Sequence, residues 1–204
     1  IKECLACARA QDYKNFELIV VDQHSQDGTA DLVAADFPEV QLIRHATNTG
    51  FADGMNRGIR TAVGHYAFLV NADLFLEPTF ISHAVGQLEI REGERVGMLA
   101  SIVYRYANGQ RTEDIDCAGC DFLPYHTAVN SDCVGESTWV ACPAGAAMFL
   151  QREMLEDIKL PSGDYLDSTY FCYGEDIELA LRAQLLGWKC LFAPIIAGWH
   201  VGGG

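Results

Sequence analysis

The strongest structural signal in this 204-residue chain is the run Glu17-Leu18-Ile19-Val20-Val21-Asp22. A continuous β-prone run that does not alternate with polar residues is typical of a strand buried on both faces, as in a parallel sheet. A polar segment, 23–28, follows it, and then comes a helical pattern over Thr29–Phe37 that ends at Pro38. The order of strand, polar loop and helix predicts an α/β fold.

The alternation of strands and helices extends outward from this run. Helices are predicted at Lys2–Gln11, Thr29–Phe37, Phe51–Val63 and Glu77–Glu89, and strands at Val40–Ile43, His65–Val70 and Val96–Tyr104. Such alternation is typical of parallel strands joined by right-handed crossovers, with helices on the faces of the sheet. We therefore expect a three-layer α/β/α fold around a mostly parallel central sheet.

The second half of the chain is less regular. The segment Arg105–Val140 lacks clear periodicity, so we expect loops and short antiparallel strands there. The apolar segment Ala144–Leu150 precedes predicted helices at Arg152–Asp157 and Gly174–Leu186 and a strand at Cys190–Ala193. Half of the residues are hydrophobic, so the length and composition predict a single domain over 1–204. Because a helix comes first and no element follows residue 200, we expect a domain truncated at both ends.

The formal net charge is −14 and the isoelectric point is about 4.6. A surface of this charge repels nucleic acids and anionic lipids, so we expect no nucleic-acid partner and at most peripheral membrane association. A diphosphate ligand would also be repelled unless a divalent cation accompanied it. Most of the carboxylates can be interpreted simply as a solubilising surface.

The chain has eight cysteines, which include two pairs with C-x-x-C spacing: Cys4, Cys7, Cys117, Cys120, Cys133, Cys142, Cys172 and Cys190. If the two pairs met in space, they could hold a zinc ion. The alternative is a set of buried, unpaired thiols, which the apolar surroundings of several of them favour. Many unpaired thiols are typical of a reducing compartment, so we expect a cytoplasmic location, including the cytoplasmic face of a membrane.

Polar residues stand at the ends of several predicted strands. Asp22 ends the first strand, and the Asn71–Asp73 tripeptide follows the strand ending at Val70. Ligands of open parallel sheets bind beyond the carboxyl ends of the strands, so these residues are candidates for a binding site. Each of them could instead cap a helix or open a turn.

Five segments have distinctive motif spacing, and they are distributed over most of the chain. They are Ile19–Thr29, Asn48–Gly58, Phe68–Asp73, Tyr173–Arg182 and the closing Gly198–Gly204. They resemble, in order, five motifs of glycosyltransferase family 2. The first is a strand followed by Asp-Asn-x-Ser-x-Asp-Gly-Thr, in which Gln23 replaces Asn. The others are Asn-x-Gly-Phe-Ala-x-Gly-x-Asn-x-Gly, an Asp-x-Asp form, Gly-Glu-Asp-x-x-Leu-x-x-Arg and a terminal His motif.

The resemblance is strongest to the rhamnosyltransferase-like branch, through Phe171–Asp176 and the terminal His-Val-Gly-Gly-Gly. It implies the GT-A fold and an inverting, metal-dependent transfer of a sugar, rhamnose among the candidates, from a nucleoside-diphosphate donor to a hydroxyl. The acceptor would be a glycan, a lipid-linked glycan or a small molecule, as in polysaccharide and cell-wall synthesis. Residues 1–104 would bind the donor, and residues 105–204 would supply the acceptor and catalytic half. The family's first strand, with its Pro-x-Tyr-Asn type motif, is missing.

The resemblance also implies a nucleotide site in the first half of the chain. Asp22 would accept a hydrogen bond from the base, while Gly50, Phe51 and Asn56 would shape the pocket. Asn71 is neutral and suits a hydrogen bond to ribose or phosphate. The alternative for Asn56 is an exposed helix residue without a ligand.

Asp73 would bind Mg²⁺ or Mn²⁺ together with the donor diphosphate, because hard divalent cations prefer oxygen ligands. His200 would contact the metal or the diphosphate, or would serve a structural role.

Asp176 is the candidate general base that removes the acceptor proton, and Glu175 is its candidate helper. Acidic residues are also common in the first turn of a helix, where the macrodipole favours them. Arg182 could orient a carboxylate or lie exposed.

Two alternatives to a glycosyltransferase stay open from the residues alone. One is a non-catalytic fragment that binds nucleotide-sugars, which the missing first strand favours. The other is a sugar nucleotidyltransferase, although no glycine-rich phosphate loop with Arg or Lys is visible. A nicotinamide oxidoreductase is excluded because no G-x-G-x-x-G follows a strand.

Overall fold

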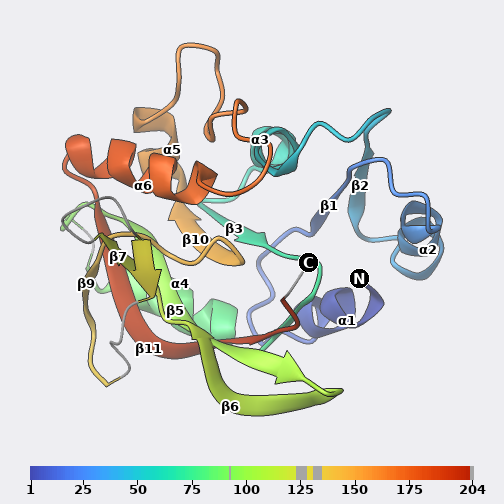
Figure 1. Cartoon of the computed structure of the whole chain (residues 1–204), viewed down its shortest axis with the longest axis horizontal. Coiled ribbons are helices and arrows are strands. Elements are labelled where there is room, and N and C mark those ends of the chain that lie inside the picture. Colours follow the sequence, from blue (N-terminus) through green and yellow to red (C-terminus); the bar gives the residue numbers. More distant parts are fainter. Residues whose placement is uncertain (92, 123–127, 131–134, 203–204) are drawn as a thin grey trace.

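The fold is organised around a seven-stranded sheet in a computed structural model that describes residues 1–91, 93–122, 128–130 and 135–202 (Figure 1). The main path of the sheet is β3–β10–β5–β11–β4, with β6 paired to β5 and β9 paired to β11. The strands are β3 (Tyr66–Val70), β4 (Leu74–Leu76), β5 (Val96–Ala107), β6 (Gln110–Cys117), β9 (Thr138–Val140), β10 (Ala147–Gln151) and β11 (Lys189–His200).

The expected mixture of helices and strands around a central sheet is confirmed, but its pairing is not mostly parallel. Only β5 and β11 pair in parallel among the described strands of this sheet. β10 lies antiparallel between β3 and β5, and β4 lies antiparallel to β11. The composition of a strand indicates whether the strand is buried. It does not determine whether the strand runs parallel or antiparallel to its neighbours, because that depends on which strands pair with it.

A second, two-stranded parallel sheet contains β1 (Ile19–Asp22) and β2 (Gln41–Arg44), joined through α2 (Thr29–Asp36). Only Asp22 of β1 is buried, whereas Ile19, Val20 and Val21 are half-buried. The prediction of a strand buried on both faces is therefore wrong for β1. Among the described residues β1 pairs with β2 alone, and one of its edges has no strand partner.

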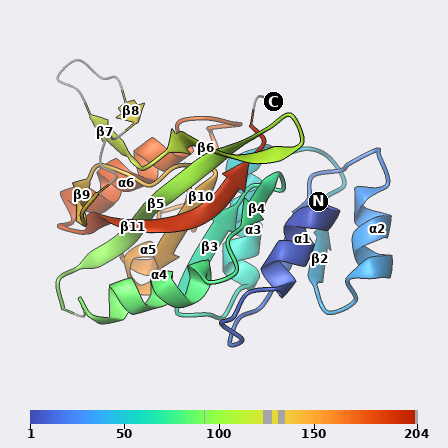
Figure 2. The ribbon, with the colours of Figure 1, turned by 90° about the horizontal axis from the view of Figure 1, so that it is seen from below.

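Helices cover both faces of the large sheet and complete three layers (Figure 2). One face packs against α3 (Phe51–Thr61), α5 (Arg152–Asp157) and α6 (Glu175–Leu185). The other face packs against α1 (Lys2–Arg9) and α4 (Phe80–Glu89). Successive residues of β10 divide between the layers, since Met148 and Leu150 belong to the first core and Phe149 belongs to the second.

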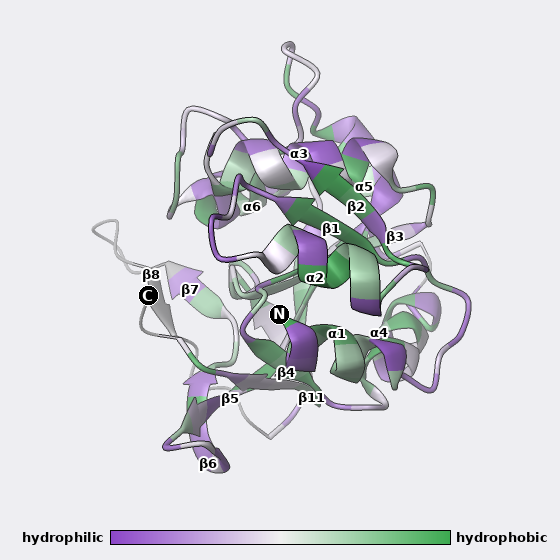
Figure 3. Ribbon diagram, turned by 90° about the vertical axis from the view of Figure 1, so that its right-hand side faces the viewer, coloured by the Kyte–Doolittle hydropathy of each residue, from purple (hydrophilic) through white to green (hydrophobic). Residues whose placement is uncertain are grey.

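The helices around the sheet carry both hydrophilic and hydrophobic residues (Figure 3), which is the pattern of helices that bury one face. A third core lies under α1 and α2 and contains Leu5, Val33, Phe37 and Val40. It connects the two-stranded sheet to the rest of the molecule. Within the described part of the chain, no helix is both long enough and apolar enough to cross a lipid bilayer.

The predicted irregular segment after β5 contains β6, β9 and a small sheet of β7 (Cys120–Phe122) and β8 (Ala128–Asn130), paired antiparallel. β11 is much longer than the four residues predicted. It continues through a register shift between Phe192 and Ile196 and reaches His200 beside β5. This extension brings His200 into the sheet, between Leu74 of β4 and Arg105 of β5.

Candidate active site

The loop after β1 is tied to the start of α3. Asp22 is buried, and its Oδ1 accepts a hydrogen bond from the Ser25 amide at 3.3 Å. Gln23 donates from Nε2 to the Gly50 carbonyl at 2.8 Å and accepts from the Thr49 amide at 3.1 Å. The glutamine that departs from the family motif therefore joins two of the motif segments, a role that the sequence comparison did not anticipate.

The start of α3 in turn contacts the loop before α6. The Phe51 amide donates to the Phe171 carbonyl at 2.7 Å. Gly50 has φ of 90°, and a side-chain carbon at this position would lie 2.6 Å from the same carbonyl oxygen. Only glycine therefore permits this approach. Phe171 is a residue of the site that the sequence motifs named without a role.

Asn56 is completely buried, so the interpretation as an exposed helix residue is wrong. Its Nδ2 donates to the Leu166 carbonyl at 2.7 Å, and its Oδ1 accepts from the amides of Tyr165 and Leu166 at 2.8 and 2.9 Å. These bonds occupy its polar atoms. Its influence on a nucleotide pocket would be indirect, through the position of the 165–166 segment.

Glu175 and Asp176 form the first turn of α6, after Gly174 in a left-handed conformation. Glu175 is only 5% exposed, and its Oε2 has no hydrogen-bond partner among the described residues. Burial raises the pKa of both carboxyl groups. The macrodipole would favour their charged forms, so desolvation outweighs it here. Carboxyl groups with raised pKa values are typical of proton-transfer sites.

Asp176 lies against the segment that leads into β10. A side-chain carbon at Gly145 would come within 2.8 Å of Asp176 Oδ2. The neighbouring Ala146 carbonyl accepts a hydrogen bond from the Asn71 amide at 3.1 Å. The candidate base and the Asp-x-Asp-like motif therefore both contact this short glycine- and alanine-containing segment.

The Asp-x-Asp-like motif meets the terminal histidine. His200 Nε2 lies 3.3 Å from Asp73 Oδ1 and 3.4 Å from Asn71 Nδ2. The Gly202 amide donates to Asp73 Oδ2 at 3.3 Å. On the other side of the ring, His200 Nδ1 lies 2.9 Å from Asp116 Oδ2. Asp116 comes from the segment expected to be irregular, and the sequence carried no signal for it.

Contacts therefore link the five motif segments, and Tyr173–Arg182 is linked to the others through residues outside the motifs: Gln23 with Gly50, Phe51 with Phe171, Asp176 with Gly145, Ala146 with Asn71, and His200 with Asp73. Asp22 and Asp73 stand at the ends of strands in two different sheets, rather than in the one sheet that was expected.

The residues fit a divalent cation only in part. No group of three or more His, Cys, Asp or Glu in the described ranges could hold a metal ion by itself. Asp73 Oδ1 and His200 Nε2 offer one oxygen and one nitrogen, both of which suit Mn²⁺. The remaining ligands would have to come from a bound diphosphate or water.

The cysteines do not form the four-thiol site that the zinc hypothesis requires. The Cys4 thiol donates to the Asn71 carbonyl at 3.7 Å. The Cys120 thiol accepts hydrogen bonds from the thiols of Cys117 and Cys142, which lowers the pKa of Cys120. Cys120 thus contacts these two thiols and not the Cys4 and Cys7 pair. The described cysteines are free thiols, and Cys133 lies outside the described residues.

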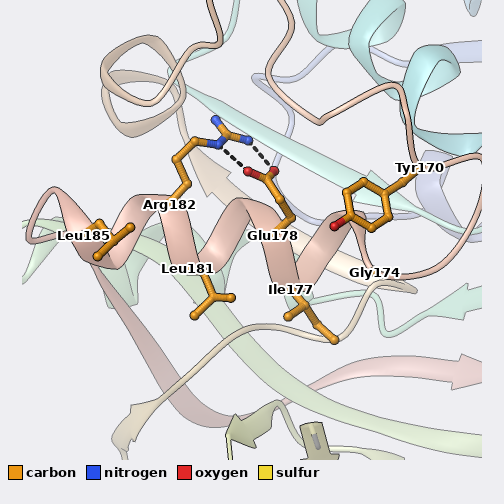
Figure 4. A pocket seen from close by; sticks show the side chains of 7 residues that line it. All are labelled: Tyr170, Gly174, Ile177, Glu178, Leu181, Arg182 and Leu185. Carbon is orange, nitrogen blue, oxygen red and sulfur yellow. Dashed lines mark hydrogen bonds and ion pairs between the residues drawn. The ribbon is translucent and has the colours of Figure 1, made fainter. Parts of the chain in front are cut away.

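A groove of about 420 Å³ runs along one face of α6, and neither Glu175 nor Asp176 is among its lining residues (Figure 4). Its lining is mainly apolar and consists of Tyr170, Gly174, Ile177, Glu178, Leu181, Arg182 and Leu185. Arg182 binds the Glu178 carboxylate through Nε and Nη2, both at 2.7 Å, and Nη2 also donates to the Tyr165 carbonyl at 2.8 Å. Arg182 therefore orients a carboxylate, and the interpretation as an exposed residue is wrong.

Comparison with known proteins adds a family match. The family profile described as Glycosyl transferase family 2 matches residues 1–158. Among curated relatives, the amylovoran biosynthesis glycosyltransferase AmsB of Erwinia amylovora is 26% identical over 206 residues, covering 97% of this chain and 64% of the relative. The chain thus spans less than two thirds of that relative's length.

Solved structures share the fold. The mannosyltransferase PcManGT from Pyrobaculum calidifontis, in complex with GDP-Man and Mn²⁺, has a TM-score of 0.70 at 20% identity, covering 99% of this chain and 53% of its own. TarS 1–349 of S. aureus, in complex with UDP, has a TM-score of 0.68 at 17% identity, covering 97% of this chain and 54% of its own. At these identities the likeness concerns the fold, and it confirms the expected GT-A architecture.

Proposed function

The chain belongs to glycosyl transferase family 2, and we propose that it moves a sugar from a nucleoside-diphosphate donor to an acceptor hydroxyl with inversion at the anomeric carbon. The observation that carries the proposal is the shared segment 145–146. Asp176 contacts it from one side, and Asn71, which neighbours Asp73 and His200, contacts it from the other. In this proposal a proton acceptor and a diphosphate-binding motif would act next to each other, as sugar transfer requires.

Donor binding in our proposal uses Asp22, Gly50, Phe51 and Asn71 around the nucleotide. Asp73 and His200 would hold Mg²⁺ or Mn²⁺, which when bound would offset the charge of the diphosphate leaving group. The net charge of −14 supports this requirement, because a bare diphosphate would be repelled. PcManGT, whose fold is similar, was solved with GDP-Man and Mn²⁺.

Asp176 is the proposed general base. It would accept the hydroxyl proton as the acceptor oxygen attacks the anomeric carbon and the nucleoside diphosphate departs. Asp176 is half-buried and accessible, whereas Glu175 is nearly inaccessible, so accessibility favours Asp176 as the base. Glu175 would help to position the acceptor. The acceptor would be a glycan, a lipid-linked glycan or a small molecule, and the apolar groove on the face of α6 lined by Ile177, Leu181 and Leu185 could hold a part of it away from the base.

A donor screen tests the proposal. Purified protein is heated with a panel of nucleoside-diphosphate sugars, rhamnose donors included, with and without Mn²⁺. We expect at least one donor to raise the melting temperature only when Mn²⁺ is present, because ligands that bind the native state stabilise it. That donor should then release nucleoside diphosphate when acceptors are added. A protein that no donor stabilises under either condition would contradict the proposed function.

A further inference from the structure

The two ring nitrogens of His200 face different carboxylates. Nδ1 lies 2.9 Å from Asp116 Oδ2, and Nε2 lies 3.3 Å from Asp73 Oδ1. The His200 side chain is 13% exposed, so these contacts, and not bulk water, form most of its surroundings. Because a neutral imidazole carries one proton, only one of the two nitrogens can donate at a time.

Asp116 is the better-held of the two carboxylates. Asp116 lies on β6 and His200 on β11, and β5 pairs with both strands and holds them in place. The two side chains meet across β5. The second oxygen of Asp116, Oδ1, lies 3.4 Å from Arg105 Nη2. The Asp116 side chain is 24% exposed, against 46% for Asp73. Water therefore screens the Asp73 contact more strongly than the Asp116 contact.

The contacts of His200 favour one tautomer. An N–H donated to a carboxylate at 2.9 Å is a short, charge-assisted hydrogen bond, and the 3.3 Å contact with Asp73 is weaker. Asn71 Nδ2 lies 3.4 Å from His200 Nε2, and an amide nitrogen donates but does not accept. Both observations assign the proton to Nδ1 and leave the lone pair on Nε2.

We propose that Asp116 is a positioning residue that holds His200 in the Nδ1–H tautomer and presents the Nε2 lone pair to a divalent cation shared with Asp73. The inference rests on the proposed function for the cation and on the geometry alone for the tautomer. An acceptor carboxylate behind a ligating histidine fixes both the ring orientation and the nitrogen available for the metal.

Nitrogen NMR of the metal-free protein at pH 8 tests the tautomer. In ¹⁵N-labelled parent protein, His200 should show a protonated Nδ1 and an unprotonated Nε2. In Asp116→Ala the ring should shift toward the Nε2–H tautomer, which free histidine prefers. Asp114→Ala is the matched control, because Asp114 is an exposed carboxylate on the same strand. It should leave the His200 signals unchanged.

Asp116→Asn keeps an acceptor oxygen without the charge, so it should give a smaller population of Nδ1–H than the parent and a larger one than alanine. If the alanine variant does not fold, this variant decides the question. Parent protein with Nε2 protonated overturns the proposal, as does an unchanged ring in the folded Asp116 variants.

Mn²⁺ binding gives the second measurement. Free Mn²⁺ is followed by electron paramagnetic resonance during titration in the presence of UDP and, separately, of GDP. Asp116→Ala should weaken Mn²⁺ binding by about 10- to 100-fold, the usual effect of losing a residue behind a metal ligand. Equal Mn²⁺ affinity in parent and Asp116→Ala overturns the metal part. A parent protein that binds no Mn²⁺ contradicts the proposed function itself, while the NMR result still decides the tautomer.

Discussion

Single residues at the start of α6 show where stability and chemistry conflict. Glu175 and Asp176 occupy a helix N-terminus, where carboxylates are normally favoured. Burial nevertheless raises the pKa of both groups, and one oxygen of Glu175 has no partner among the described residues. A fold that keeps such groups tolerates an energetic cost, which is typical of residues retained for reactivity.

Asp176→Asn should separate donor binding from turnover. The substitution preserves shape but removes the proton acceptor, so we expect unchanged donor affinity and a loss of turnover of about 10²- to 10⁴-fold. Initial rates of nucleoside-diphosphate release and donor binding by calorimetry measure the two quantities. Normal turnover in Asp176→Asn combined with an inactive Glu175→Gln would exchange the two roles, and activity in both variants would place the base elsewhere.

Glu175→Gln should stabilise the protein at neutral pH and not in acid. Because burial raises the pKa of Glu175, the folded state holds the proton more tightly than the unfolded state. The contribution of Glu175 to stability is therefore fully present below its pKa in the unfolded chain, and it is lost as the pH rises through its pKa in the folded protein. We expect the variant to gain on the order of 1 kcal/mol in the free energy of unfolding at pH 7.5. Urea unfolding at pH 4 and 7.5 checks this, and an equal gain at both pH values would contradict it.

Whole elements are joined at glycine contacts and by one buried amide. The start of α3 approaches the loop before α6 at Gly50, and Gly145 lies against Asp176 at the start of α6. Asn56 in the middle of α3 holds the 165–166 segment by three hydrogen bonds. These contacts fix the position of α3 relative to the start of α6, although more than 100 residues separate the two helices in sequence.

Gly50→Ala should cost more stability than Gly28→Ala. Gly28 has φ of 83° and ψ of 6°, in the left-handed region where a side chain costs roughly 1–2 kcal/mol, whereas Gly50 has φ of 90° and ψ of 169°, a conformation essentially restricted to glycine. Nothing lies within 4 Å of a side-chain carbon at Gly28, whereas one at Gly50 would meet the Phe171 carbonyl oxygen at 2.6 Å. Gly28→Ala is thus the control for a left-handed glycine in open surroundings, and both the backbone conformation of Gly50 and its contact with Phe171 predict a larger loss in Gly50→Ala. Equal unfolding free energies for the two variants in urea would show that the Phe171 contact is unimportant.

Asn56→Ala should destabilise the protein by about 2–4 kcal/mol, because three hydrogen bonds are lost and two buried amides are left without a partner. Arg57→Ala, one position along the same helix, removes only an exposed ion pair with Asp53 and should cost less than about 1 kcal/mol. Thermal and urea unfolding of the two variants provide the comparison. A loss in Asn56→Ala no larger than that in Arg57→Ala would refute the assigned role.

At the scale of the molecule, the proposed donor half (1–104) and the proposed acceptor half (105–204) both contribute strands to the β3–β10–β5–β11 sheet, with helices on both faces. The Asp73 and His200 pair lies at one margin of this arrangement and supplies too few ligands to hold a cation alone. Cation and donor binding should therefore depend on each other.

Asp73→Ala should abolish metal-dependent donor binding. In the parent protein we expect Mn²⁺ to bind detectably only when the nucleoside diphosphate is present, since one carboxylate and one imidazole form a weak site. Titration of Mn²⁺ with and without the donor, in parent and variant, measures this coupling. If the variant retains the same Mn²⁺-dependent donor affinity, Asp73 is not a ligand.

Local periodicity alone determined much of the architecture of this protein. The helices at α2, α3, α5 and α6 were located from their apolar spacing and end signals to within about two residues, since those signals are local. The site candidates Asp73, Glu175, Asp176 and His200 came from the resemblance to the family motifs, and their roles stay predictions. The short β4 was missed, because three residues after a turn carry too little pattern to distinguish a strand.

Only the tertiary structure decided the strand directions, the partners of the motif residues and the role of Asn56. Each depends on contacts between distant segments: β10 between β3 and β5, Asp116 against His200, and Asn56 against 165–166. No residue type or spacing encodes such a neighbour, because an aspartate in an irregular segment looks the same whether it faces water or a histidine. The free energy that selects these neighbours comes from packing and hydrogen bonding across the assembled core, which exists only once the chain has folded.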